Sequence, residues 1–487
     1  MLKNKLNSFK NRFKNIFKNI FKNDFRLDKL FMNVSLIIPI FLSLVFLISN
    51  NLLLGLLLIV SIIFIIRKYK GKHFVLYLLL IATLVRIAGI IVFNVPQTSD
   101  FAVLLEAARK FNLGDYSFSK SGYFAMWPYQ TGFVLYEALM LKIVNSEIFL
   151  KLLNIFYEIG LTYFIYKTVK ALVGETPARI TAALYAVFPF SIYSATVISN
   201  HHLSALLSYL SIYFLLKNNK EDKLSNYIIA GILLGLSNVL RPEGIVIIFS
   251  YLLYRILKLT KKDILKSKKW LITVVRCSIF VCFYSLVNMG VSTYLVKSNI
   301  NEDGLKNNNP LWKFVLGTNP DTCGRYDTND EIYLGDETKE LEVIKDRINN
   351  PYKIGKLLLC KTNNFVLNGS LESSSGIYND KKIKVLGLEV AYKTLEDLVS
   401  GVNKVIYGLM ILGLVVGVYL KKKDILNSNL FYFYILFITN TLVYMLIEIQ
   451  PRYTYFINVT VFILGSVGIN KLLKLWDNRH KIIKIKN

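Results

Sequence analysis

The sequence predicts an all-α membrane protein with about 12 transmembrane helices and a small exoplasmic region of helices and loops. Hydrophobic residues make up 54% of the 487 positions, which is more than the core of a soluble protein needs. They recur in runs close to the roughly 20 residues that span a hydrocarbon core of about 30 Å. Short basic segments separate these runs. A polytopic helical fold explains all of these observations.

Positive charge follows the predicted topology. The formal net charge of +27 is compatible with a nucleic-acid partner, but lysine and arginine gather between apolar runs, where the positive-inside rule places them. We therefore predict no nucleic-acid partner. We expect a multi-pass protein in contact with the lipid of the plasma membrane, with its N- and C-termini in the cytoplasm.

The chain divides into six predicted parts. Residues 1–30 alternate phenylalanine with lysine and asparagine, which is typical of a basic amphipathic segment on a cytoplasmic membrane surface. The other parts are an N-terminal transmembrane hairpin (31–73), a large transmembrane module (74–297) with its first exoplasmic loop at 96–127, an exoplasmic domain (298–401), C-terminal transmembrane helices (402–473) and a basic cytoplasmic tail (474–487).

The predicted crossings come from the apolar runs near 33–49, 51–66, 74–95, 128–145, 148–170, 178–197, 203–217, 226–240, 243–258, 271–297, 402–420, 430–449 and 452–473. Strict alternation allows one crossing between the loop at Asp100 and the basic loop at 167–179, but two runs lie there. Either 128–145 is a partial or interfacial segment or one basic loop breaks the rule. We favour the first, because the Trp-Pro-Tyr sequence at 127–129 is typical of a segment that starts at the interface.

The end of the crossing 74–95 is the first place to look for chemistry. After a polar stretch at 96–100, residues 101–113 place apolar side chains on one helical face and charged side chains on the other. This pattern indicates a helix that lies along the membrane surface. Asp100 therefore opens an interfacial helix, beside its positive dipole end. The alternative is a solvated residue at a helix start, where aspartate is common.

Three other polar segments are predicted on the same outer side. They are 199–202 (Ser-Asn-His-His), 241–244 (Arg-Pro-Glu-Gly) and 450–453 (Gln-Pro-Arg-Tyr). With the Asp100 loop they would open toward one exoplasmic cavity. Arg241 and Arg452 also have simpler interpretations, as headgroup-level anchors or as members of local pairs such as Glu448 with Arg452.

The exoplasmic region contains Cys323 and Cys360, and an oxidising compartment permits a disulfide between them, although two cysteines do not establish one. Residues 336–349 predict a charged helix, and 385–399 predict a surface helix over the cavity. Within the crossings, Arg86 is expected to form a structural pair with Glu158 or Glu137, because charges in apolar runs usually face the protein interior and pair.

Several of these segments together resemble the GT-C fold glycosyltransferases, which include protein O-mannosyltransferases and the aminoarabinose transferases of lipid A. They are Asp100 after a crossing, the aromatic-Pro segment 127–129, the helix-Pro-helix hairpin 188–202, and the segments 235–242, 312–319 and 448–453. The resemblance covers roughly residues 74–470 and implies that 74–297 is the catalytic module. Asp100 has no acidic neighbour, which argues against protein O-mannosylation in particular.

The resemblance implies a membrane glycosyltransferase (EC 2.4 class, hexosyl or pentosyl) with an exoplasmic acceptor that is a glycan, a lipid or a protein. Because nucleotide sugars stay in the cytosol, an outward-facing enzyme needs a lipid-linked donor such as a polyprenyl-phosphate sugar. Asp100 would either be the general base of an inverting displacement or bind a metal. Arg241, Arg452 and Tyr453 would bind the donor phosphate.

Three further residues are candidates for acceptor or metal binding. Family members often carry a second acid where this chain has His201 and His202, so either a histidine replaces that acid as a ligand of a divalent metal (Mg or Mn) or the site works without metal. Adjacent histidines diverge by about 100° on a helix and are poor metal ligands together. Glu106 is the third candidate, with a solvated helix face as the alternative.

Three other classes of function are compared with this interpretation. A lipid-linked glycan polymerase or ligase would also use outer arginines, but with a pyrophosphate-linked oligosaccharide donor. A secondary transporter would have a similar number of crossings, but no internal repeat is apparent in the sequence. A non-catalytic membrane scaffold gives no reason for polar motifs to converge on one side.

Overall fold

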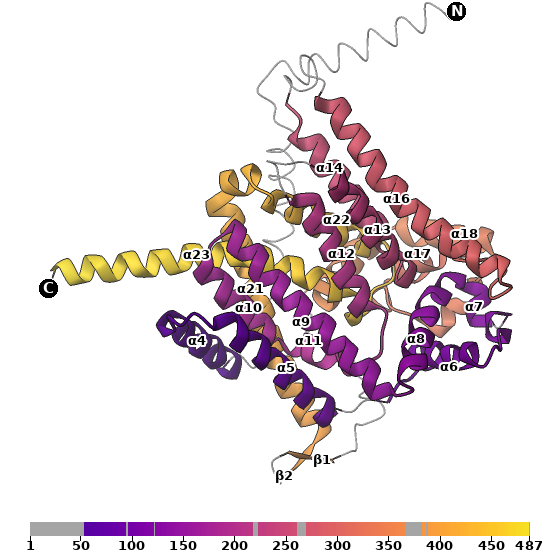
Figure 1. The fold of residues 1–487 in the computed structure, drawn as a ribbon, viewed down its shortest axis with the longest axis horizontal. Coiled ribbons are helices and arrows are strands. Elements are labelled where there is room, and N and C mark those ends of the chain that lie inside the picture. Colours follow the sequence, from indigo (N-terminus) through magenta and orange to yellow (C-terminus); the bar gives the residue numbers. More distant parts are fainter. Residues whose placement is uncertain are drawn as a thin grey trace, which may run out of the picture.

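The structure is a computed structural model that describes residues 53–93, 96–120, 122–217, 223–260, 269–366, 382–385 and 388–486. The predicted amphipathic segment 1–30 and the first half of the hairpin 31–73 lie outside the described residues. The described chain is almost entirely helical (Figure 1). This confirms the predicted all-α polytopic class.

The first part of the described chain carries helices α4 (Leu53–Lys68), α5 (Phe74–Phe93), α6 (Asp100–Asn112), α7 (Gly122–Met126), α8 (Thr131–Ile143), α9 (Glu147–Leu172), α10 (Glu175–Ala186), α11 (Pro189–Ser194), α12 (His201–Leu216), α13 (Leu224–Leu240), α14 (Gly244–Lys258) and α16 (Lys269–Lys297), with 3₁₀ turns η1 (Ser117–Lys120) and η2 (Pro128–Gln130). Then follow α17 (Trp312–Gly317), η3 (Thr328–Tyr333), α18 (Glu337–Ile348), α19 (Pro351–Lys361), η4 (Thr362–Val366), β1 (Lys382–Val385), β2 (Leu388–Ala391), α21 (Tyr392–Asn427), α22 (Leu430–Leu446), η5 (Pro451–Tyr453) and α23 (Thr454–Lys486).

Five of the described helices are long and apolar enough to cross a membrane, and they belong to α5, α9, α16, α21 and α23. Helices α12, α13 and α22 are apolar but shorter. Helix α8 is shorter still: its 13 residues span about 20 Å at 1.5 Å per residue, against a hydrocarbon core of about 30 Å. This length agrees with our preference for 128–145 as a partial segment.

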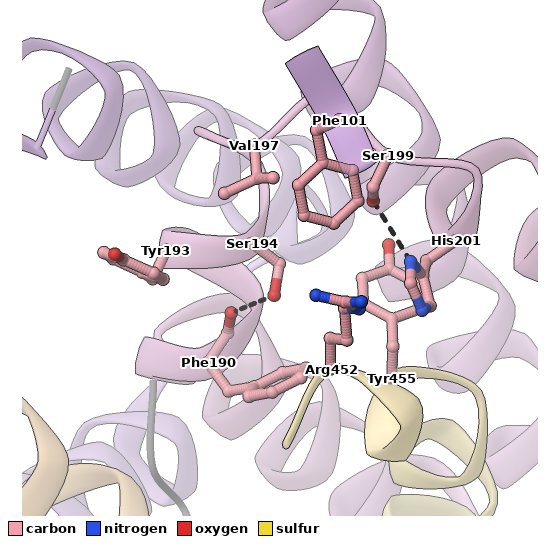
Figure 2. Close-up of a pocket in the computed structure, with 9 residues that line it drawn as sticks. All are labelled: Phe101, Phe190, Tyr193, Ser194, Val197, Ser199, His201, Arg452 and Tyr455. Carbon is pink, nitrogen blue, oxygen red and sulfur yellow. Dashed lines mark hydrogen bonds between the residues drawn. The ribbon is translucent and has the colours of Figure 1, made fainter. Parts of the chain in front are cut away.

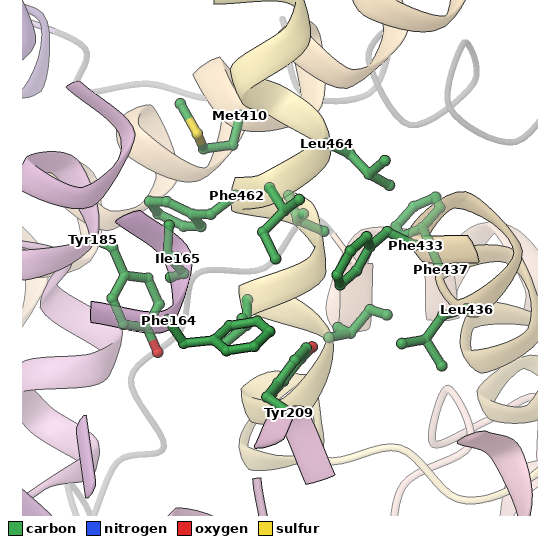
Figure 3. Close-up of a cluster of buried hydrophobic side chains, with 14 of the residues drawn as sticks. Phe164, Ile165, Tyr185, Tyr209, Met410, Phe433, Leu436, Phe437, Phe462 and Leu464 are labelled. Atoms are coloured by element: carbon green, nitrogen blue, oxygen red, sulfur yellow. The ribbon is translucent and has the colours of Figure 1, made fainter. Parts of the chain in front are cut away.

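The core forms around α23, which runs through the middle of the buried cluster in Figure 3. Phe462 and Leu464 of α23 meet Met410 of α21 and Phe433 of α22 there. Helices α21 and α23 approach so closely that a Cβ added at Gly468 would collide with the backbone of Gly413. Small residues at such crossings allow the dispersion contacts that hold helices together in lipid.

A buried charge network lies in the same bundle. Arg86 of α5 pairs with Glu158 of α9 at 3.6 Å, and both side chains are fully buried. The Arg86 guanidinium also donates to the carbonyl of Ala186 at 3.0 Å and to the hydroxyl of Ser191 at 2.7 Å. The predicted structural pair is therefore confirmed with Glu158, while Glu137 is buried without a hydrogen-bond partner among the described residues.

Residues 298–401, which were predicted to be exoplasmic and are called the exoplasmic region below, differ from expectation in one place. The helix predicted at 336–349 is present as α18, and a disulfide joins Cys323 to Cys360 with a Cα–Cα distance of 5.5 Å. The surface helix predicted over 385–399 is wrong. Its first part belongs to the antiparallel hairpin of β1 and β2, in which Ile383 pairs with Val390, and its second part begins the long helix α21. The two β-branched residues suit paired strands.

Candidate active site

The carboxylate of Asp100 is positioned by the turn before α6. The side-chain carbonyl of Gln97 accepts a hydrogen bond from the backbone N–H of Ile198 at 2.9 Å, which ties this turn to the segment between α11 and α12. Ser99 then adopts φ 51° and ψ −135°, a conformation that side chains rarely adopt and that clusters at functional sites. Asp100 follows as the first helical residue, with 42% of its side chain exposed.

The turn η5 brings Arg452 to this carboxylate. The Nη2 atom of Arg452 lies 3.2 Å from Oδ2 of Asp100, across a sequence separation of 352 residues. The guanidinium group also packs over the ring of Phe101, at 5.0 Å from its centroid, and over the ring of Tyr453 at 5.6 Å. A planar guanidinium held over two rings keeps a defined orientation toward Asp100.

The buried ring of Tyr453 is the common contact of three cations. Arg241 lies 5.0 Å from the ring centroid, and Arg452 and Lys313 each lie 5.6 Å from it. The Tyr453 hydroxyl accepts a hydrogen bond from Lys313 and donates one to Glu448, both at 3.3 Å. Tyr453 therefore holds the predicted donor-binding arginines at one place, and it adds a lysine that the sequence analysis did not assign.

Each of these cations has a carboxylate partner. Arg452 pairs with Asp100, Arg241 pairs with Glu243 at 2.5 Å, and Lys313 pairs with Glu448. The exposed side-chain fractions differ: 42% for Asp100, 15% for Glu243 and 1% for Glu448. Asp100 is therefore the most accessible of the three carboxylates.

Glu448 bonds to Lys313, and Arg452, its other expected partner, bonds to Asp100. Burial alone would raise the pKa of Glu448, but the Lys313 ammonium group and hydrogen bonds from Lys313 and Gln450 outweigh burial and lower it. Glu448 is thus held in its charged form between the exoplasmic region and η5.

The exoplasmic region docks on the end of α22 through backbone and lysine contacts. The Nζ atom of Lys361 donates to the carbonyls of Tyr444, Met445 and Ile447 at 3.2, 3.1 and 2.7 Å, which satisfies acceptors that the end of a helix leaves free. Lys361 directly follows the disulfide-bonded Cys360. The disulfide therefore restrains the segment around Lys361, which contacts the end of α22 just before Glu448.

A small open pocket lies beside the pair of Asp100 with Arg452 (Figure 2). It is lined by Phe101 of α6, by Phe190, Tyr193 and Ser194 of α11, by Val197, Ser199 and His201, and by Arg452 and Tyr455. Aromatic rings form much of its wall, and the guanidinium group reaches into it (Figure 2). This combination suits an anionic group attached to an apolar chain.

The two candidate histidines differ in their surroundings. Nδ1 of His201 lies 3.2 Å from the Ser199 hydroxyl, while its buried Nε2 has no hydrogen-bond partner among the described residues. His202 lies behind the pocket, where Nδ1 contacts the Tyr455 hydroxyl at 2.8 Å and Nε2 contacts the Val197 carbonyl at 3.3 Å. In this arrangement only His201 has a ring nitrogen left for a ligand.

Glu106 lies on an exposed face of α6, about one and two-thirds turns after Asp100. It makes no hydrogen bond or ion pair within the described part of the chain. Tyr326 is influenced by the charge of Asp100: a hydrogen bond to Glu331, burial and the charges of Glu331 and Asp100 raise its pKa to about 12. Nothing in the sequence around Tyr326 indicated this position.

A divalent metal has a weak donor set here. Within the described ranges, no three His, Cys, Asp or Glu side chains converge as metal ligands. The residues present thus do not fit a metal site built by the protein alone, and we derive no step through a metal. Among the three carboxylates that pair with cations at this site, Asp100 has the most exposed side chain.

Part of the chain is similar in sequence to a known family. Residues 133–285 match the sequence profile of a family described as dolichyl-phosphate-mannose-protein mannosyltransferase. The match begins in α8 and ends in α16, so it includes Arg241 and both histidines but neither Asp100 nor Arg452. A comparison with curated protein sequences gave no match.

Among solved structures, the archaeal oligosaccharyltransferase AglB from Archaeoglobus fulgidus, in complex with an inhibitory peptide and a dolichol-phosphate, aligns with a TM-score of 0.46 and 12% sequence identity. The alignment covers 86% of this chain and 52% of that chain, so this protein spans about half the length of AglB.

The described helices and the family match over residues 133–285 both agree with a GT-C type of membrane glycosyltransferase. Within that class, the part of the chain from α8 to α16 is similar to the mannosyltransferase family named above. This similarity supports the resemblance noted in the sequence over that part of the chain.

Proposed function

We propose that this enzyme transfers a sugar from a polyprenyl-phosphate donor to an acceptor on the outer side of a plasma membrane, with inversion at the anomeric carbon. The pair of Asp100 with Arg452 is the observation that carries the proposal. It joins a general base and a phosphate-binding cation at 3.2 Å beside a pocket with aromatic walls. The mannosyltransferase family match supports a donor that is a lipid-linked sugar phosphate.

The donor phosphate would enter by exchanging partners. The phosphate oxygens would accept hydrogen bonds from the Arg452 guanidinium, and Arg241 lies nearby, against the same Tyr453 ring. The Asp100 carboxylate would then be released from its ion pair with Arg452. Charge-assisted hydrogen bonds from arginine to phosphate are short and often bidentate. Donor binding therefore frees the base at the moment when the leaving group is in place.

The chemical step would be a single displacement. Asp100 accepts the proton of the acceptor hydroxyl, whose oxygen forms a bond to the anomeric carbon while the bond from that carbon to the phosphate oxygen breaks. The electron pair leaves with the polyprenyl phosphate, whose charge Arg452 stabilises. His201 would contact the acceptor or donor through its free Nε2, and Glu106 would lie at the edge of the acceptor path.

The replacement Asp100→Asn tests the base directly. We expect kcat to fall by about 10²- to 10⁴-fold, with donor affinity retained, because the amide keeps the shape of the carboxylate but cannot accept the proton. The measurement follows free polyprenyl phosphate released from a panel of polyprenyl-phosphate sugars by purified protein. Asp346→Asn, an exposed position on α18, is the matched control.

Two outcomes would contradict the proposal. Full release by Asp100→Asn would remove Asp100 from the mechanism. Turnover restricted to pyrophosphate-linked oligosaccharides would assign the protein to the polymerases or ligases instead. The same assay with a chelator, and then with added Mg²⁺ or Mn²⁺, shows whether a metal bound by Asp100 and the donor phosphate takes part.

A further inference from the structure

A second cavity lies far from Asp100. It has a volume of about 530 Å³ and lies between the ends of α12 and α14, the start of α16 and the turn from α21 to α22. In Figure 1 the start of α16 is at the top of the view and α6 is at the lower right. The proposed transfer reaction has no use for this cavity, so its chemistry is separate from the active site.

The cavity is strongly basic. Arg255, Lys258, Lys269 and Arg276 line it, and no carboxylate does so among its described lining residues. A concave site with several cations concentrates positive potential and attracts an anion.

Arg255 is held in place by neutral groups. Its guanidinium donates to the hydroxyls of Tyr227 and Tyr251, both at 3.2 Å, and to the hydroxyl of Thr273 at 3.3 Å. These hydroxyls orient the guanidinium without cancelling its charge. An arginine oriented in this way is suited to bidentate binding of a phosphate.

The remaining wall of the cavity is apolar and open to one side. Leu215, Leu259 and Ile272 line it, and Ile272 of α16 is 47% exposed. The outer face of α16 continues this surface with Leu271 and Val275, which are 45% and 49% exposed. Exposed apolar residues on a membrane-crossing helix face hydrocarbon, so an anion in this cavity can carry an apolar chain along α16.

We propose that this cavity binds the phosphate group of an anionic phospholipid, with the headgroup between Arg255 and Arg276 and the acyl chains along α16. Basic pockets between transmembrane helices bind such headgroups at the cytoplasmic side. Two basic segments, after α12 and between α14 and α16, adjoin this cavity, and the positive-inside rule places such segments in the cytoplasm. The bound lipid would join the ends of α14, α16 and α21.

Native mass spectrometry of the purified full chain tests the site with phosphatidylglycerol, phosphatidylcholine and inorganic phosphate as probes. We expect wild-type protein to retain phosphatidylglycerol over phosphatidylcholine. The double variant Lys269→Gln with Arg276→Gln should bind phosphatidylglycerol about 30-fold more weakly, from the effect of two basic residues at an anionic headgroup. The double variant Lys68→Gln with Lys167→Gln removes equal charge from exposed positions outside the cavity and should bind normally.

The competition arm separates the two sources of phosphate. Displacement of the lipid by millimolar inorganic phosphate would assign the site to a soluble phosphate compound, and retention would assign it to the lipid. Equal retention of both lipids by wild type, with no binding of phosphate, overturns the proposal, as does equal binding by wild type and the cavity variant. If the double variant is too unstable to purify, the single variant Lys269→Gln is compared with wild type instead, and its binding of phosphatidylglycerol should be several-fold weaker.

Discussion

At the scale of single residues, the site is a set of paired charges around one aromatic ring. The Tyr453 ring contacts Arg241, Lys313 and Arg452, and each cation faces a carboxylate. This arrangement keeps the buried site close to neutral until a substrate arrives. Unpaired buried charges are costly, and partners for them limit that cost while leaving the cations available to a stronger anion.

Arg452 is expected to act by geometry as well as by charge. Arg452→Lys keeps the charge but loses the forked donor, so the KM for the donor should rise by roughly 10- to 100-fold, from about 1.5–3 kcal/mol for a hydrogen bond to a charged group. Steady-state kinetics over a range of donor concentrations measures this change. Arg109→Gln, which removes an exposed arginine that pairs with Glu147, is the control. An unchanged donor KM in Arg452→Lys would place the phosphate elsewhere.

Glu448 gives the structure a dependence on acidic pH. Its pKa in the folded protein is lowered from 4.5, so its contribution to stability is fully present above about pH 4.5 and is lost as the pH falls through the folded pKa. Thermal unfolding of wild type and Glu448→Gln from pH 7 to pH 3 should show a constant difference near neutrality that shrinks below about pH 4.5. A difference that does not change with pH would mean that Glu448 is not charged in the folded protein.

At the scale of elements, the exoplasmic region acts as a brace for the loop between α22 and α23. The backbone N–H of Glu448 donates to the carbonyl of Lys313 at 2.7 Å, and that of Ile449 donates to the carbonyl of Gly324 at 2.8 Å. Gly324 adopts φ 74°, next to the disulfide-bonded Cys323. The disulfide and the site are thus coupled through a few residues of chain.

Removal of the disulfide should loosen this brace. Cys323→Ser with Cys360→Ser opens a loop with a sequence separation of 37, and loop-closure entropy gives an expected loss of about 3–4 kcal/mol, with a lower kcat as Glu448 and Arg452 lose their support. Thermal unfolding with and without a reductant measures the stability change. Cys282→Ser, at an exposed free cysteine, should behave as wild type. A wild type that is insensitive to reductant would show that the bridge does not support the site.

At the scale of the whole molecule, the helices separate two chemically different ends. Residues at the starts of α6, α12 and α14 and after α22 meet around Tyr453, while the ends of α12 and α14 and the start of α16 meet at the basic cavity. Arg67 at the end of α4 pairs with Asp477 of α23, which places the C-terminal helix beside another basic loop. One end is proposed to be exoplasmic and the other cytoplasmic.

Labelling tests this orientation. In a Cys282→Ser background, the exposed positions Lys120→Cys, near α6, and Lys68→Cys, at the end of α4, are treated in intact cells with a maleimide that cannot cross membranes. We expect the cysteine at 120 to react from outside and the cysteine at 68 to react only after permeabilisation. The reverse pattern would place Asp100 in the cytosol and end the proposal of an exoplasmic acceptor.

Much of the fold was predictable because lipid imposes a strong local rule. A backbone without water must satisfy its hydrogen bonds within each segment, so every long apolar run becomes a helix. The interfacial helix α6 followed from the same reasoning, since its amphipathic period is local. The hairpin formed by β1 and β2 was not predicted, because the spacing of apolar residues in such short strands is also compatible with the start of a helix.

The site was predictable only in part. Asp100, Arg452 and Tyr453 were identified because they stand beside crossings, and the structure brings all three together. Lys313 and Glu243 lie within segments that the sequence analysis identified, but neither residue was assigned a role. A contact with a residue that is distant in sequence leaves no local signal. Tyr326 carried no signal at all.

The sequence by itself determined that this protein spans a membrane with helices and that one acid opens a helix at its surface, because apolar length and amphipathic period are properties of consecutive residues. Only the tertiary structure decided which charges pair, because residues 352 apart in the chain meet through the packing of α6 against η5. It also decided the disulfide, the bond of Glu448 to Lys313 and the basic cavity, since each depends on where separate helices end in space.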